Sequence, residues 1–78
     1  MSVMTTRKRL ALVIRSRMAL CEMTQARLAE QINMGRSSLS ARLSGERDFS
    51  YSELESVAQA LSVSLRDLLP AEEKEEQR

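Results

Sequence analysis

The sequence predicts an all-α domain of five short helices. Apolar residues recur at intervals of three and four along several segments, which is the spacing of one helix face. Residues that cap helix N-termini, such as Thr24, Ser50 and Ser64, stand just ahead of those segments. No segment alternates apolar and polar residues in the manner of a strand. The length of 78 residues allows one hydrophobic core, so the five helices should form one domain.

The first helix is expected from Thr6 or Arg7 to about Leu20, after a flexible polar arm at residues 1–6. Its apolar positions follow helical spacing: Leu10, Val13, Ile14, Met18 and Cys21. Cys21 is the single cysteine of the chain, which excludes an intrachain disulfide. We expect it to be a small buried residue.

The second and third helices are short and lie close together in the sequence. Thr24 can cap the second helix, and Asn33 can end it because asparagine tolerates the left-handed conformation. Gly35 can cap the third helix, which Gly45 then ends. The inner faces of the two helices are predicted to carry Leu28, Ala29 and Ile32, and then Leu39 and Leu43.

Capping boxes mark the start of the last two helices. Ser50 with Glu53 precedes the fourth helix, and Ser64 with Asp67 precedes the fifth. The fifth helix should end at Leu69 because the following proline disfavours helical geometry in the residue before it. The domain is thus expected to span residues 7–69, followed by an acidic, disordered tail at residues 70–78.

The net charge of +1 conceals a strong asymmetry between the two parts of the chain. Residues 1–47 contain nine Lys/Arg and three Glu, a net charge of +6, whereas residues 48–78 contain three Lys/Arg and eight Asp/Glu, a net charge of −5. A basic part that faces a polyanion, with an acidic part held away from it, is typical of a nucleic-acid-binding protein.

The third helix is rich in serine, which is a mediocre helix former. Two short helices joined by a few residues must cross steeply to bury their narrow apolar stripes, which is the helix-turn-helix arrangement. The outer face of the third helix then meets base edges in the major groove of DNA. Arg36 there can bind guanine with two hydrogen bonds, while the short hydroxyls of Ser37 and Ser40 allow close approach and polar contact with bases.

The segments "MTQARLAEQINMGRSSLSARLSG" and "SYSELESVAQALSVSLRDLL" resemble the lambda-repressor-like, Cro and xenobiotic-response-element helix-turn-helix family. The resemblance covers about residues 10–69. It implies a five-helix lambda-repressor-like fold in which Gln25 braces Arg36, Ser37 reads bases and Ser44 lies beside a phosphate. Two glycines usual in the family are replaced by Glu22 and Asn33.

Further contacts with the DNA backbone are expected from residues around the third helix: Ser38, Arg42 and Arg47. The family often has a bulky tryptophan where this chain has arginine at position 42, so we expect that arginine to hold a phosphate. The cluster Arg7-Lys8-Arg9 opposes the helix macrodipole at a cost of a few tenths of a kcal/mol per charge. A phosphate partner would offset that cost, so this cluster too is expected to contact DNA.

A weak homodimer is the expected assembly, because one recognition helix contacts too few base pairs for tight discrimination. The fifth helix is too short to bury all its leucines, so its surface is the predicted dimer interface: Leu65, Leu68 and Leu69. The alternative is that all three leucines close the core and that the protein acts as a monomer.

The sequence therefore predicts a sequence-specific double-stranded DNA-binding transcription regulator. The expected type is a small repressor of phage or prophage kind, acting by occlusion with the helix at residues 35–44 in the major groove. One alternative is an antitoxin-type module that binds a basic protein, and another is an architectural or recombination factor that bends DNA.

Several other classes of function are disfavoured. The chain contains no histidine and one cysteine, so neither a metal site nor any other cofactor is expected. No pair of carboxylates lies in a cleft-forming pattern, so we expect neither an enzyme nor a small-molecule receptor. No apolar run approaches the roughly 20 residues of a membrane span, and no secretory signal is recognisable, so a cytoplasmic location at the nucleoid is expected.

Overall fold

The computed structural model describes residues 5–69. It contains five helices, in agreement with the predicted all-α class: α1 (Thr6–Leu20), α2 (Gln25–Gln31), α3 (Arg36–Leu43), α4 (Tyr51–Ala60) and α5 (Leu65–Leu68). Thr5 caps α1, which begins at Thr6, the earlier of the two predicted starts; positions 5 and 6 of the expected arm therefore belong to the helix and its cap. Positions 1–4 of the expected N-terminal arm and the whole acidic tail at 70–78 lie outside the described residues. None of the described helices is long and apolar enough to cross a membrane.

The predicted N-terminal caps are confirmed. The side chains of Thr24, Ser50 and Ser64 each accept a hydrogen bond from a backbone N–H in the first turn of α2, α4 and α5. The capping boxes of α4 and α5 are both complete. These hydrogen bonds satisfy N–H groups that have no partner within the helix, which is why the helix starts were readable from the sequence.

Four helix C-termini end in the same way. In each, the second residue beyond the helix has a positive φ: +55° at Glu22, +58° at Asn33, +87° at Gly45 and +59° at Ser62. The N–H of this residue and that of the next one donate to carbonyls of the last helical turn, as in the Schellman motif. Three of the four positions carry a side chain, although glycine is the residue that adopts this conformation without strain.

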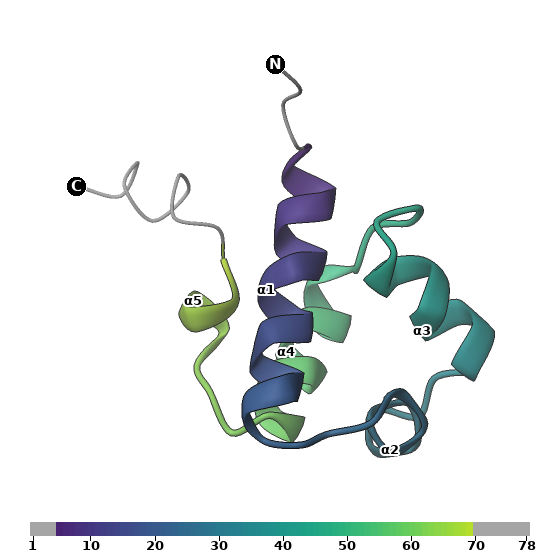
Figure 1. The fold of residues 1–78 in the computed structure, drawn as a ribbon, viewed down its shortest axis with the longest axis vertical. Coiled ribbons are helices and arrows are strands. Elements are labelled where there is room, and N and C mark those ends of the chain that lie inside the picture. The colour runs from purple at the N-terminus through teal and green to yellow at the C-terminus, as the bar shows by residue number, and fades with distance from the viewer. Residues whose placement is uncertain (1–4, 70–78) are drawn as a thin grey trace.

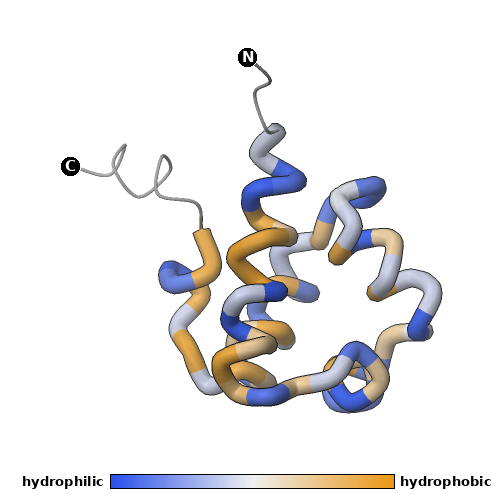
Figure 2. Tube along the Cα trace, viewed as in Figure 1, coloured by the Kyte–Doolittle hydropathy of each residue, from blue (hydrophilic) through white to orange (hydrophobic). Residues whose placement is uncertain are grey.

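The core lies between the five helices: α3 packs against α1 and α2, and α5 packs against α1 and α4 (Figure 1). Figure 2 shows apolar positions of α1, α4 and α5 beside one another, while the start of α1 is hydrophilic. The buried core combines residues from every helix and one loop: Ile14, Met18, Leu28, Ala29, Leu39, Leu43, Phe49, Leu54, Val57, Ala58, Leu61 and Leu68. Phe49, in the loop before α4, was not predicted as a core residue.

The expectation for Cys21 is wrong, because this residue is exposed. It is the C-cap of α1, one residue past the helix, and the chain reverses at Glu22. The last buried position of α1 is Met18. The thiol of Cys21 instead donates a hydrogen bond to the carbonyl of Arg17, 3.1 Å away.

Candidate DNA-binding surface

In the segment α2–turn–α3, α3 lies at the side of the domain (Figure 1). Leu39 and Leu43 are almost completely buried, which fixes the inner face of α3. The outer positions are all exposed: Arg36, Ser37, Ser38 and Ser40. The predicted base-reading residues therefore lie together on the solvent side of one helix.

The arginines near α3 differ in their partners. Among residues 5–69, no hydrogen bond or ion pair engages the side chain of Arg36 or Arg47. Arg42, in contrast, pairs through Nε with Oε1 of Glu53 at 3.1 Å and donates through Nη1 to the carbonyl of Ser38 at 3.0 Å. Thus Arg42, expected to hold a DNA phosphate, already has two partners within the chain.

A shallow hollow lies beside the outer face of α3. It is lined by two serines, two arginines and one small apolar residue: Ser37, Ser38, Ala41, Arg42 and Arg47. Hydroxyl and guanidinium groups are the usual donors to phosphate oxygens. The hollow therefore has the chemistry expected at an anion-binding surface.

Two further predicted contacts lie at the ends of the helix-turn-helix. Ser44 is exposed at the C-cap of α3, and its hydroxyl donates to the carbonyl of Ala41 at 2.9 Å, so it remains able to accept a hydrogen bond. Gln25 is exposed as the first residue of α2. The predicted bracing of Arg36 by Gln25 stays a prediction.

The basic cluster at the start of α1 is attached to the loop between α3 and α4. Nε of Arg7 lies 2.7 Å from Oδ1 of Asp48, and its Nη1 donates to the carbonyl of Glu46 at 3.2 Å. Lys8 packs over Gly45, where an added Cβ would lie 2.6 Å from Cγ of the lysine. Arg7 and Lys8 thus have a structural role that the sequence did not reveal.

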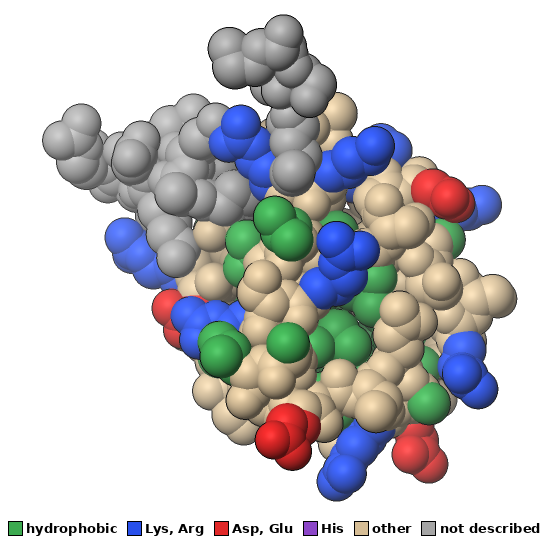
Figure 3. Space-filling model, viewed as in Figure 1, with side chains coloured by type: hydrophobic (Ala, Val, Ile, Leu, Met, Phe, Trp, Pro, Cys, Tyr) green, Lys and Arg blue, Asp and Glu red, His purple; other side chains and the backbone are tan. Residues whose placement is uncertain are grey.

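In Figure 3, basic side chains lie around the start of α1 and along the side where Figure 1 places α3, among uncharged residues and a few acidic ones. Counted over the described residues, positions 5–47 carry a net charge of +6 and positions 48–69 a net charge of −3. The predicted asymmetry is therefore present within the folded domain, and its basic part includes the whole helix-turn-helix.

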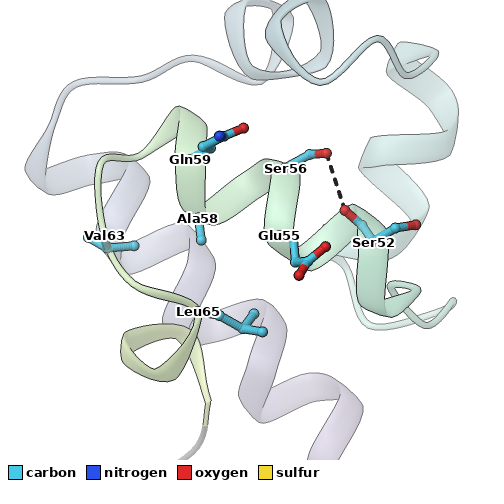
Figure 4. A pocket seen from close by; sticks show the side chains of 7 residues that line it. All are labelled: Ser52, Glu55, Ser56, Ala58, Gln59, Val63 and Leu65. Carbon is cyan, nitrogen blue, oxygen red and sulfur yellow. Dashed lines mark hydrogen bonds between the residues drawn. The ribbon is translucent and has the colours of Figure 1, made fainter.

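The predicted dimer residues of α5 differ in exposure. Leu68 is completely buried in the core, so it is not available to another chain and this part of the expected interface is wrong. Leu65 and Leu69 are half-buried. Leu65 lines a second hollow, between α4 and α5, whose other residues come from α4 and the following turn: Ser52, Glu55, Ser56, Ala58, Gln59 and Val63 (Figure 4).

Comparisons with known proteins agree with this architecture. A family model described as helix-turn-helix matches residues 14–68. Among curated protein sequences, none matches this chain.

Three solved structures are similar. The clp gene regulator ClgR from C. glutamicum is 30% identical with a TM-score of 0.81, and the match covers 86% of each chain. The hypothetical transcription factor NHTF from Neisseria is 28% identical with a TM-score of 0.80, over 95% of this chain and 86% of that chain. The restriction-modification controller protein C.AhdI from Aeromonas hydrophila shares the fold, with 22% identity and a TM-score of 0.76 over 80% of this chain and 94% of that one. The chain belongs to the lambda-repressor-like helix-turn-helix family.

Proposed function

We propose that this protein is a transcription regulator that binds double-stranded DNA sequence-specifically, with α3 in the major groove. One observation carries the proposal. The outer face of α3 exposes Arg36, Ser37 and Ser40, while its inner leucines are buried. Arginine and serine are among the residue types that bond to base edges, and no residue of the described chain engages the guanidinium of Arg36.

Contacts to the phosphate backbone would surround this helix and set its register on the duplex. Arg47 and Ser38 expose suitable donors at and beside α3. The hydroxyl of Ser44 would reach a phosphate oxygen by exchanging its bond to the carbonyl of Ala41. Gln25 at the start of α2 and the basic start of α1 would extend the same surface. Family membership and the resemblance to a clp gene regulator support regulation of transcription as the role.

We further propose that two copies bind a site with two inverted half-sites. A single module contacts about four or five base pairs and buries roughly 600–1,000 Å², which gives too little discrimination in a genome. Of the three leucines in the predicted interface, the half-buried Leu65 and Leu69 are the two that a partner copy can still contact. Sedimentation on DNA with one half-site and then two measures this, and independent filling of the two half-sites would argue against a dimer.

Repression by occlusion is the mechanism that such a small DNA-binding domain supports best, because a bound protein blocks access to its site. We expect no catalytic activity. The expectation of a phage or prophage origin and that of a nucleoid location both stay predictions, as do the alternative roles of an antitoxin and of a DNA-bending factor.

Selection of bound sites from a random pool of duplex DNA tests the proposal directly. A single enriched motif should emerge, and Arg36→Ala should then weaken binding to that motif by about 1–3 kcal/mol and relax the preference at one base pair. Arg66→Ala, which removes an exposed arginine of α5, is the control and should retain the preference at every position. Recovery of random DNA, or equal loss by both variants, would exclude base reading by Arg36.

A further inference from the structure

The side chain of Arg42 links α3 to α4. Its Nη1 donates to the carbonyl of Ser38, one turn earlier in α3, and its Nε donates to Glu53 in α4. The two side chains of this ion pair are only 18% and 29% exposed. A guanidinium is planar, so two hydrogen bonds from neighbouring nitrogens fix its orientation.

Glu53 is held as firmly as Arg42. Its Oε1 accepts one hydrogen bond from the backbone N–H of Ser50 at 2.8 Å and another from Arg42 at 3.1 Å. The Ser50 N–H, and then the Arg42 guanidinium, lower the pKa of this carboxyl despite the opposing effect of desolvation. The carboxylate therefore stays charged at neutral pH and connects the capping box of α4 to α3.

This link supplements the packing of α3. The closest helix neighbours of α3 are α1 and α2, and α4 packs mainly against α5 and α2. Apolar contacts are not directional, so Leu39 and Leu43 resist separation of α3 from the core better than they resist its rotation. Hydrogen bonds depend steeply on angle. The Arg42–Glu53 pair can therefore set the rotation of α3 relative to α4.

A helix that reads base edges must hold its side chains within about 0.5 Å of the productive geometry. We propose that Arg42 and Glu53 form a brace that positions α3 for base reading, and that Arg42 is a positioning residue rather than a contact to phosphate. The proposal rests on the DNA-binding function proposed above. In the hollow that both arginines line, Arg47 is then the one that binds phosphate.

The salt dependence of DNA binding separates the roles of the two arginines. Arg47→Met should weaken binding to selected and random DNA alike, and should make the slope of log affinity against log salt shallower by about 0.9 for one lost phosphate contact. Arg42→Met should leave that slope unchanged. It should weaken binding to the selected site by about two- to 150-fold, the range for side chains coupled in one network.

Glu53→Gln is the sharper variant, because electrostatics and the brace predict opposite results. Removal of a negative charge from a DNA-binding protein reduces its repulsion of phosphate, so electrostatics alone predicts tighter binding. The brace predicts weaker binding to the selected site. Glutamine keeps a carbonyl that accepts from the Ser50 N–H, so the start of α4 is preserved, whereas the bond from Arg42 loses its charged acceptor and is weakened. The matched control is Glu55→Gln, which removes an exposed charge two residues away that does not touch α3 (Figure 4).

The double variant Arg42→Met/Glu53→Gln completes the test. It should bind the selected site no more weakly than Arg42→Met alone, because loss of the Arg42 guanidinium already removes the bonds that Glu53→Gln weakens. Circular dichroism at the assay temperature verifies that each variant is folded. A shallower salt slope for Arg42→Met, or equal affinity for Glu53→Gln and Glu55→Gln, would overturn the proposal.

Amide hydrogen exchange separates failure of the brace from failure of the proposed function. If the unaltered chain binds no duplex in the site selection, the DNA-binding proposal fails. The brace still predicts faster exchange in α3, by a similar factor in Arg42→Met, Glu53→Gln and the double variant. Unchanged exchange in α3 would overturn the brace whether or not the protein binds DNA.

Discussion

Replacement of Gly45 by alanine should destabilise the domain severely, for two reasons that can be measured separately. Gly45 has a φ of +87°, a conformation that side chains rarely adopt. A Cβ at this position would also lie 2.6 Å from Cγ of Lys8 and 3.4 Å from its Cα. Since Lys8 is in the first turn of α1, the clash would separate α1 from the turn that ends α3.

The magnitude follows from these contributions. Left-handed geometry costs an alanine about 1–2 kcal/mol, and the less flexible unfolded chain offsets about 0.4–1 kcal/mol of it. Overpacking against Lys8 adds about 1–3 kcal/mol. The expected loss is therefore about 3 kcal/mol. For a domain of this size such a loss lowers Tm by about 12–24 °C.

Urea denaturation followed by far-UV circular dichroism measures the loss. Gly35→Ala is the matched control, because Gly35 has a φ of −63° and an added Cβ would meet nothing closer than Oγ of Ser38 at 3.9 Å. It should change the free energy of unfolding by less than about 1 kcal/mol. In the Gly45→Ala background, Lys8→Ala should restore about 1–2 kcal/mol by removing the clashing Cγ. Equal losses for the two glycine variants would contradict both proposed causes. No recovery with Lys8→Ala would exclude the clash with Lys8.

Three other changes in stability are expected. Glu22→Gly should raise the free energy of unfolding by about 0.5–1 kcal/mol, because glycine adopts its positive φ without strain; a lower urea midpoint would contradict this. The pKa of Glu53 lies below its ordinary value of 4.5 in the folded state, so the stability it provides is complete above about pH 5.5 and is lost as the pH falls through the folded pKa. Glu53→Gln should therefore lose less stability than the parent chain on acidification below pH 4.5 in denaturation curves. Leu68→Ala should cost about 2–5 kcal/mol, because it empties a completely buried position; a loss below about 1 kcal/mol would show that α5 contributes little to the core.

The helices of the fold could be predicted from local sequence. The capping residues and the apolar spacing predicted all five helices, because a cap or a helix face depends on residues only a few positions apart. For the same reason, the serines and Arg36 on the outer face of α3 were predictable as exposed residues once Leu39 and Leu43 were placed in the core.

Which charged side chains pair within the chain depends on how the helices pack, and local sequence does not show it. Arg7 meets Asp48 across 41 positions of sequence, and Arg42 meets Glu53 across 11. The sequence predicted a contact with the DNA backbone for these two arginines and for Arg47 alike, since each is a cation in the basic part of the chain. Cys21 shows the same dependence, because its exposure follows from the place where α1 ends and the chain reverses. An ion pair requires two side chains to come within about 4 Å, and the angles at which whole helices cross decide that distance.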